Sequence, residues 1–442
     1  MPLQTTTAAQ AHSLPELHLR RRELLANLAI LQHSAATGFS TGASWAAGRL
    51  ETAEAELEVL RADVLHRGLL TYEPKTGEGF KALLYSVFGG LVAEVFEGLV
   101  SKLLEMGSAP QTLLDVLRAH SAVDCDTFDP EVPSKLGPFV DCTSNQAIAY
   151  HELIRVDGEG KQVHAQLIQD AIAFAAVKKQ VYAEVDTAEL AVEVMMVKLA
   201  LRIVPHLTGY SHIQTNPKYS YSKQKTIENA QRIMAAFKEL DPTYNTKRVC
   251  IKIPATWEGM QACRELEGRG IATLATTMFC MEQAALASHV GCTYIAPYIN
   301  ELRVHFDAGY VDENKAFDFC GSAQRYYEKI GSRTRVLPAS LTSVQEVMRL
   351  AGAHHITVAP PLLTKLAETP ANPWEGDTGS VFSRDHGADE GVFGDYGRIV
   401  EDEGGWRLAF TRSLGGRAEG KIVQAINIFC EKQEGLEGLA RR

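Results

Sequence analysis

Lys252 is the residue whose position in this sequence most clearly indicates chemistry. It interrupts the apolar run Val249–Ala255, which reads Val-Cys-Ile-Lys-Ile-Pro-Ala and is typical of a buried strand. Lysine is rarely buried without a partner, because removing its charge from water is costly. Burial favours the neutral amine, which is the nucleophile that forms a Schiff base with a carbonyl group. From this segment alone, a structural lysine that reaches the strand end or pairs with Asp126 is an equally good interpretation.

Asp126, in the segment Val-Asp-Cys-Asp-Thr-Phe-Asp, is the natural partner for proton transfer. Asp124 lies two residues earlier and faces the same side of a strand, so it competes for this role. Either carboxylate could instead cap the following helix, which is the more frequent use of an aspartate in such a loop. The sequence therefore leaves two candidates for one acid or base.

Eight short β-rich runs, with helical patterns between most of them, are the elements that must position these residues. The runs are Ser121–Phe128, Gly137–Asn145, Tyr210–Asn216, Val249–Ala255, Ile271–Thr277, Cys292–Asn300, Thr334–Ser340 and His355–Pro360. Eight strand-helix alternations over roughly 250 residues predict an α/β fold of the (β/α)₈ TIM barrel type, with an open doubly wound sheet as the alternative.

The carboxyl ends of the strands carry the chemistry in such a barrel, so the last residues of each run define a candidate site. Seven of the eight runs end on or near a residue that can donate, accept or titrate: Asp126, Asn145, Gln214, Lys252, Thr276, Tyr298 and Ser340. This agreement between separate strands favours the catalytic interpretation of Lys252.

The rest of the chain divides into two parts. Residues 14–70 are rich in Leu, Ala, Arg and Glu with apolar residues at helical spacing, and we predict that residues 1–110 form an α-helical N-terminal extension. Residues 111–442 are expected to form the barrel domain. Within it, the stretch 371–405 is rich in Gly and Asp and has little periodicity, which predicts a loop before the last helix.

Composition limits the partners. The chain has 44 Lys and Arg against 54 Asp and Glu, a net charge of −10, and so lacks the basic field that nucleic-acid binding needs. The longest apolar stretch, Leu83–Leu104, contains charged residues and predicts a buried helix rather than a membrane span. We therefore expect a cytoplasmic protein that binds neither nucleic acid nor membrane.

No motif indicates a metal or another cofactor. The eight cysteines form no Cys-x-x-Cys pair, and His-Glu-x-x-His does not occur. The adjacent His354 and His355 begin a strand and point to opposite faces, so they cannot easily share one metal. Gly415–Lys421 has the spacing of a phosphate-binding loop, but Ile422 stands where that loop requires Ser or Thr.

Five segments carry a resemblance to a known family. They are Ser121–Asp129, Asp141–Asn145, Ile251–Gly259, Gly270–Thr276 and Ile356–Leu363. In this order, and above all in Lys-Ile-Pro-Ala-Thr-Trp-Glu-Gly, the sequence from about Gln111 to Leu439 resembles the transaldolase family. The resemblance implies a cofactor-free (β/α)₈ barrel in which Lys252 forms the Schiff base and Asp126 is the acid or base. It further implies that Thr276 orients the catalytic water and that Asn145 and Thr143, with Ser340, bind substrate.

Two departures from the family pattern concern the reaction. Gln214 stands where sugar-phosphate transaldolases have a Glu that holds the water, and Tyr298 stands where they usually have Phe. Both residues are similar to the fructose-6-phosphate aldolase branch, which performs direct aldol addition. A tyrosine hydroxyl near the acceptor carbonyl can protonate the developing alkoxide.

Two further departures concern the substrate. Glu301 aligns with an arginine and Thr342 with a basic residue of the family's phosphate site. Phosphate recognition needs cationic donors, and a carboxylate repels a phosphate. Arg303 or Lys365 could substitute from nearby. Even so, Glu301 in the substrate site predicts a substrate that is not a conventional sugar phosphate.

The sequence thus predicts a Schiff-base aldolase that joins or separates a ketone donor and an aldehyde acceptor in carbohydrate metabolism. One alternative is a pentose-phosphate transaldolase acting on sedoheptulose 7-phosphate and glyceraldehyde 3-phosphate. The other is a non-catalytic barrel that serves as a binding partner, although an unneeded buried lysine would cost stability. Because related barrels generally associate, we also expect a homo-oligomer.

Overall fold

The computed structural model describes residues 112–372, 376, 379–382 and 396–441 of the 442-residue chain. The chain divides into two units, 1–111 and 112–442, and every described residue belongs to the second. The predicted helical extension over residues 1–110 lies outside the described residues, and so does much of the predicted loop at 371–405.

Eight parallel strands form a single sheet. They are β1 (Ala122–Asp126), β2 (Cys142–Thr143), β3 (Ser211–Gln214), β4 (Val249–Pro254), β5 (Ala272–Met278), β6 (Tyr294–Pro297), β7 (Arg335–Val336) and β8 (His355–Val358). Their spatial order runs from β7 through β6, β5, β4, β3, β2 and β1 to β8. The amide of Thr357 in β8 donates to the carbonyl of Pro338, just after β7, at 3.2 Å, so the two ends of the sheet meet. The expected (β/α)₈ barrel is confirmed.

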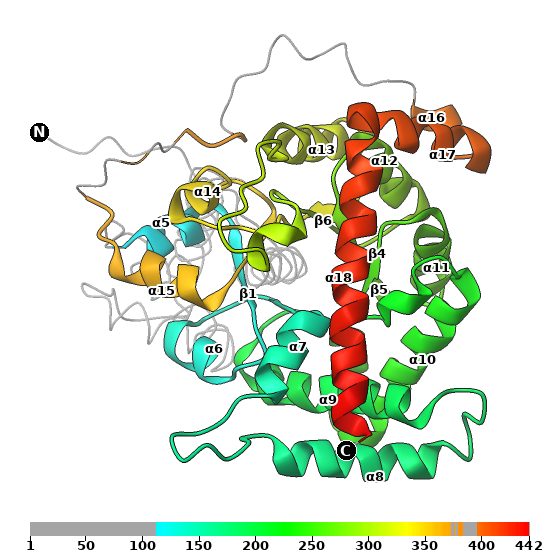
Figure 1. Cartoon of the computed structure of the whole chain (residues 1–442). Coiled ribbons are helices and arrows are strands. Elements are labelled where there is room, and N and C mark those ends of the chain that lie inside the picture. The colour runs from blue at the N-terminus through cyan, green and yellow to red at the C-terminus, as the bar shows by residue number, and fades with distance from the viewer. Residues whose placement is uncertain (1–111, 373–375, 377–378, 383–395, 442) are drawn as a thin grey trace, which may run out of the picture. The chain divides into compact units, whose positions relative to one another are not determined.

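Helices follow the strands and cover the outside of the sheet (Figure 1). They are α5 (Leu113–His120), α6 (Glu131–Leu136), α7 (Gln146–Leu153), α8 (Ala165–Lys178), α9 (Thr187–Ile203), α10 (Lys223–Leu240), α11 (Trp257–Gly268), α12 (Met281–Val290), α13 (Phe317–Ile330), α14 (Val344–Met348), α15 (Pro360–Glu368), α16 (Tyr396–Ile399), α17 (Glu403–Arg412) and α18 (Arg417–Ala440). Short 3₁₀ turns η2 (Pro217–Tyr219) and η4 (Leu302–His305) follow β3 and β6. Among the described residues, no helix has both the length and the apolar character to cross a membrane.

The predicted loop at 371–405 contains more regular structure than its composition indicates. Tyr396–Ile399 form α16, and α17 begins at Glu403. The ring of Tyr396 packs edge-on against Tyr326 of α13 at a centroid distance of 5.7 Å, and Val400 belongs to the buried core. These apolar contacts supply the tertiary packing that stabilises short helices, which local periodicity does not reveal.

Helix α18 crosses the face of the barrel where the strands end. It contacts α7, η2 and η4, which follow β2, β3 and β6, and it also contacts β5. Figure 1 shows this helix in red, running across the front of the strands. Because catalytic residues of such barrels lie at this face, α18 covers the region in which the candidate site must be sought.

Candidate active site

Lys252 lies inside the barrel. Its neighbours Ile251 and Ile253 are fully buried members of the core, whereas the Nζ atom of Lys252 lies 6.0 Å from the ring centroid of Tyr298. Tyr298 follows β6, so this contact spans β5 and must cross the barrel interior. Lys252 is 2% exposed and has no ion-pair partner among the described residues. The structural pairing with Asp126 that the sequence leaves open is therefore not found in the part of the chain that the structure describes.

Gln214 and Thr276 lie on the strands next to Lys252. Gln214 pairs in register with Lys252, and Thr276 pairs with Pro254. Both side chains are buried, and Nε2 of Gln214 donates to Oε1 of Gln146 at 2.8 Å. Within the described residues, Oε1 of Gln214 and Oγ1 of Thr276 have no hydrogen-bond partner. Because buried polar atoms nearly always have one, these two atoms can hold a water or a substrate hydroxyl.

The end of β5 carries local backbone strain. The pairing with β6 shifts register between Ala275 and Met278, and Thr277 has a φ of 57°. A positive φ is a genuine outlier for a β-branched residue and costs about 1–3 kcal/mol. Such irregularities re-aim side chains next to active sites. At this position the irregularity lies directly beside Thr276.

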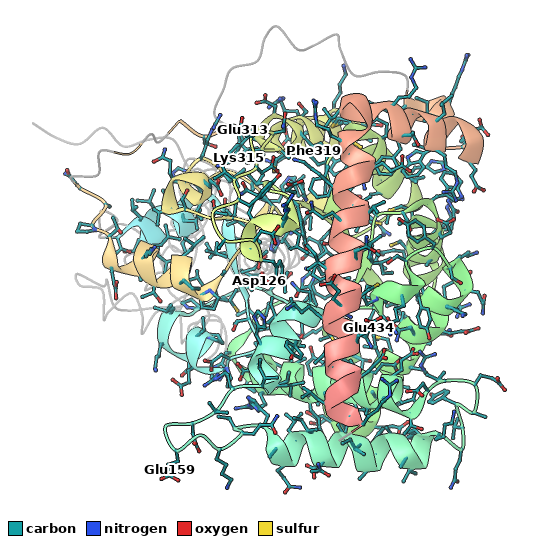
Figure 2. All side chains as sticks on the ribbon, viewed as in Figure 1. Asp126, Glu159, Glu313, Lys315, Phe319 and Glu434 are labelled. Atoms are coloured by element: carbon teal, nitrogen blue, oxygen red, sulfur yellow. The ribbon has the colours of Figure 1, made fainter. Side chains whose placement is uncertain are left out.

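Asp126 is the partly exposed carboxylate at the end of β1, and Figure 2 labels it near the middle of the view. Oγ1 of Thr143 donates to Oδ1 of Asp126 at 2.7 Å. The same hydroxyl lies 2.5 Å from Oγ1 of Thr357 on β8, which can donate to it. Thr143, predicted from the sequence as a substrate contact, thus positions the Asp126 carboxylate.

Asp124, the competitor for the acid-base role, is engaged elsewhere. Its carboxylate lies 3.0 Å from Nδ1 of His355 and accepts the amide of Asp141 at 2.9 Å, with no exposure to solvent. Burial raises the pKa of Asp124, against the opposing effect of His355. Burial acts to lower the pKa of His355, but the charge and hydrogen bond of Asp124 outweigh it and raise that pKa. Asp126 is therefore the carboxylate of this strand that remains available at the mouth.

A polar layer lies beneath the candidate site. His212 and Asp124 each precede a site residue by two positions, so they share its interior face one layer lower. Nε2 of His212 is 2.9 Å from Oδ2 of Asp141, and the ring of Tyr294 lies between His212 and His355 at centroid distances of 5.3 and 5.1 Å. Branched apolar residues usually fill this layer.

The polar layer contains the three side chains that most resemble a metal site. Asp124, Asp141 and His355 each place one potential ligand atom within 4.8 Å of the others. Their groups are already paired: Asp124 with His355, and Asp141 with His212 and with the amide of Tyr210 at 2.6 Å. Burial acts to raise the pKa of Asp141, but the His212 hydrogen bond and charge outweigh it and lower that pKa. This hydrogen bonding accounts for the cluster as a structural network.

Asn145 follows β2 by two residues and Ser340 follows β7 by four, so each lies beyond the carboxyl end of its strand. Oγ of Ser340 is 2.9 Å from Nε2 of His305, the last residue of η4. Oδ1 of Asn145 caps α7 by accepting the amides of Ala147 and Ile148 at 2.8 and 3.0 Å. The Nδ2 group of Asn145 is therefore the part of this side chain that can contact a substrate.

Glu301 takes part in a cluster within its own loop. Its amide donates to Oδ2 of Asp312 at 2.8 Å, and its carboxylate accepts a hydrogen bond from Tyr310, which raises the pKa of Tyr310 to about 12. Lys421 of α18 pairs with Asp312 at 2.6 Å. Among the described residues, no hydrogen bond or ion pair joins Glu301 to Lys252, so its role in the substrate site stays a prediction.

Sequence reasoning missed three residues near the site. His305 lies in a 3₁₀ turn rather than at a strand end, and Lys421 is the last residue of the run that fails as a phosphate-binding loop. Asp141 precedes β2 by one residue, and its sequence position indicates only that it begins a family-like segment. The carboxylates in the loop around Asp312 could have indicated a partner for Lys421, because a buried lysine is usually paired.

The comparison with known families decides what this arrangement is. Residues 123–390 match the model of the family described as "Transaldolase/Fructose-6-phosphate aldolase". The chain belongs to this family. The match covers the strands that bear Asp126, Lys252 and Ser340, and the family model includes both activities. Membership in the fructose-6-phosphate aldolase branch therefore stays a prediction.

Curated members of the transaldolase family extend the match along the chain. "Transaldolase A" of Pasteurella multocida is 30% identical over 346 residues, which cover 74% of this chain and 98% of that protein. "Transaldolase" of Actinobacillus pleuropneumoniae is 30% identical over 266 residues, or 58% of this chain and 80% of the relative. "Transaldolase" of Chlamydia pneumoniae is 27% identical over 261 residues, or 58% and 76%. The chain is an enzyme of the transaldolase and aldolase class, with aldol-type chemistry.

Proposed function

We propose that this transaldolase-family barrel makes or cleaves a carbon-carbon bond through a Schiff base on Lys252. The observation that carries the proposal is the placement of Lys252, which is buried inside the barrel without an ion-pair partner among the described residues. The unpartnered oxygens of Gln214 and Thr276 on the two neighbouring strands support it. A buried amine that is not held by a carboxylate can act as a nucleophile.

In the proposed reaction, the neutral Nζ of Lys252 attacks the carbonyl carbon of a ketone and gives a carbinolamine. Loss of water from this adduct forms the imine, and loss of a proton from the adjacent carbon forms an enamine. The enamine carbon then bonds to the carbonyl carbon of an aldehyde, whose oxygen takes up a proton; the reverse order cleaves the bond. Water finally hydrolyses the imine and releases the product and the free lysine.

Four side chains would move or hold the protons of this reaction. Asp126 is the acid or base, since it is partly exposed and is held by Thr143. Gln214 and Thr276 would hold the water through which the protons pass, and the hydroxyl of Tyr298 would protonate the alkoxide. Proton transfer by a positioned side chain typically contributes about 10²–10⁴-fold to the rate.

The substrate that we propose carries no phosphate. Glu301 is buried and bonded within its loop, and the amide of Thr342 donates to Glu346 at 2.7 Å. Arg303, a possible substitute, pairs with Asp307 and stacks on the ring of Tyr310 at 4.4 Å. Phosphate binding requires cationic donors that converge on the anion, whereas Glu301 is a carboxylate, Thr342 carries no charge and Arg303 is already engaged.

A pentose-phosphate transaldolase is the second candidate, and the names of the relatives favour it. "Transaldolase A" of Pasteurella multocida matches over 98% of its own length. Turnover of fructose 6-phosphate with erythrose 4-phosphate at rates above those of unphosphorylated sugars would select this candidate.

Borohydride trapping tests the proposed function. The full chain is incubated with dihydroxyacetone, hydroxyacetone, fructose or fructose 6-phosphate, reduced, and examined by intact-protein and peptide mass spectrometry. We expect a reduced adduct on Lys252, formed more readily with an unphosphorylated ketone. An adduct on another lysine would contradict the assignment of Lys252, and preference for fructose 6-phosphate would contradict the proposed substrate class.

Asp126→Asn is expected to lower kcat by about 10²–10⁴-fold, because the amide cannot exchange protons with the bound intermediate. The matched control is Asp129→Asn, three residues later, where the aspartate pairs with Arg155 at 3.0 Å outside the strand. Steady-state kinetics of both variants check this prediction. Equal activities of the two variants would remove Asp126 from the mechanism.

A further inference from the structure

His305 and Ser340 form a fixed pair at the rim of the barrel. Nε2 of His305 lies 2.9 Å from Oγ of Ser340. Ser340 has a φ of 61°, which is uncommon for any residue other than glycine. Its carbonyl accepts hydrogen bonds from the backbone amide of Asn300 at 3.3 Å and from the Nδ2 group of the same residue at 2.9 Å. These bonds hold the strained backbone that presents the Ser340 hydroxyl to His305.

The pair is accessible and borders the candidate site. His305 is exposed and Ser340 is half-buried, so a bound molecule can reach both. The protein packed around the imidazole lowers the pKa of His305, although the charges of Asp126 and Glu346 act to raise it. The ring is therefore neutral at pH 7. Ala339, the neighbour of Ser340, pairs with Tyr298, whose ring centroid lies 6.0 Å from Nζ of Lys252, so the pair borders the candidate site.

The basic side chains of this rim are already engaged. Lys315, labelled in Figure 2, pairs with Glu346 at 2.7 Å, and Lys421 pairs with Asp312 at 2.6 Å. Arg303 pairs with Asp307, and Lys432 lies over the rings of Tyr150 and Phe306 at 5.5 and 5.1 Å. A phosphate bound at Ser340 would have to compete with these partners for one of the four cationic side chains. A neutral hydroxyl would not.

We infer that His305 and Ser340 recognise a free hydroxyl group of the substrate and determine specificity for a hydroxylated carbonyl compound. The serine hydroxyl offers one donor and two acceptor positions, and a neutral imidazole offers one donor and one acceptor. Their mutual hydrogen bond uses one donor and one acceptor, so one donor and at least one acceptor remain to bind a substrate hydroxyl. This inference rests on the proposed Schiff-base function and names the substrate class that the same site accepts.

Three aldehydes that differ at a single carbon test the inference. They are glyceraldehyde, lactaldehyde, which lacks the terminal hydroxyl, and glyceraldehyde 3-phosphate, each supplied with the ketone that gives the Lys252 adduct. We expect the wild-type chain to use glyceraldehyde about 3- to 10-fold better than lactaldehyde, the value of one neutral hydrogen bond. We expect no gain from the phosphate. A preference for glyceraldehyde 3-phosphate, or no difference between the first two, would overturn the inference.

Variants of the pair separate recognition from a structural role. His305→Ala and Ser340→Ala are expected to raise KM for glyceraldehyde about 3- to 10-fold and to raise KM for lactaldehyde less. His305→Gln, whose amide can still bond to Ser340, should restore part of the preference. His120→Gln, at an exposed histidine that ends α5, is the control. Equal losses with both aldehydes would overturn the inference.

The outcomes also separate this inference from the proposed function. If no ketone gives an adduct on Lys252 in the wild-type chain, the proposed function fails and the inference fails with it. If the adduct forms but the three aldehydes are used equally well, or none is used, the proposed function stands and only the role of His305 and Ser340 is overturned.

Discussion

Lys252→Met is expected to lower kcat by on the order of 10⁴-fold or more, because the nucleophile of the proposed reaction is lost entirely. Borohydride reduction with the active ketone should then leave the protein mass unchanged. The same substitution should preserve or raise stability, because replacing a buried polar side chain with an apolar one of similar size is often neutral or stabilising. Lys252 is 2% exposed with apolar neighbours on its strand, which suits methionine.

Kinetics, mass spectrometry and urea unfolding of the full chain check this expectation together. Lys365→Met is the matched control, since Lys365 is exposed on α15 and its loss should leave the adduct intact. An adduct that survives Lys252→Met, or activity within about tenfold of wild type, would show that Lys252 is not the nucleophile. If Lys252→Met loses its fold as well as its activity, Lys252→Gln is tested in its place.

Asp124→Asn is expected to lower the free energy of unfolding by about 3–5 kcal/mol, the usual cost of removing one partner of a buried charged pair. Asp124 and His355 are 0% and 1% exposed and lie 3.0 Å apart, so water cannot replace the lost partner. Asp126→Asn, at the partly exposed carboxylate two residues later, should cost much less. Equal losses of stability in the two variants would contradict this account of the polar layer.

The same pair predicts how stability depends on pH. The pKa of His355 is raised in the folded state, so its contribution is fully present below the unfolded value of 6.5 and is lost as pH rises through the folded pKa. The pKa of Asp124 is also raised, and a raised carboxyl pKa again favours the folded state at the lower pH. The His355 effect makes the protein less stable as pH rises above about 6.5, and the Asp124 effect acts in the same direction from its unfolded value of 3.8 upward.

Urea unfolding between pH 5.5 and pH 9 measures this dependence. His355→Gln should flatten the decline above pH 6.5, since glutamine keeps a hydrogen-bonding group but does not titrate. His120→Gln, at an exposed histidine outside the barrel interior, should leave the slope unchanged. A wild-type stability that rises over this range, or a slope that His355→Gln does not change, would contradict the prediction.

Local sequence was sufficient to predict the strands and the interior position of Lys252. Each of the eight predicted runs contains its observed strand, except that β5 ends one residue beyond its run. Buried parallel strands are recognisable because they are mostly apolar. For the same reason, the alternation around Lys252 placed it on the face opposite Ile251 and Ile253. The fold class and the candidate nucleophile follow from patterns that are contiguous in the chain.

Residue types and spacing alone left Asp124 and Asp126 as competitors, because both face the same side of β1; the family resemblance favoured Asp126, and the tertiary structure shows how the two differ. The difference lies in His355, which is 231 residues from Asp124 and reaches it only when β8 pairs with β1. The contact between His305 and Ser340 likewise depends on how η4 and the end of β7 meet. Spacing along the chain determines which face a side chain occupies, whereas barrel closure determines which distant side chains share that face.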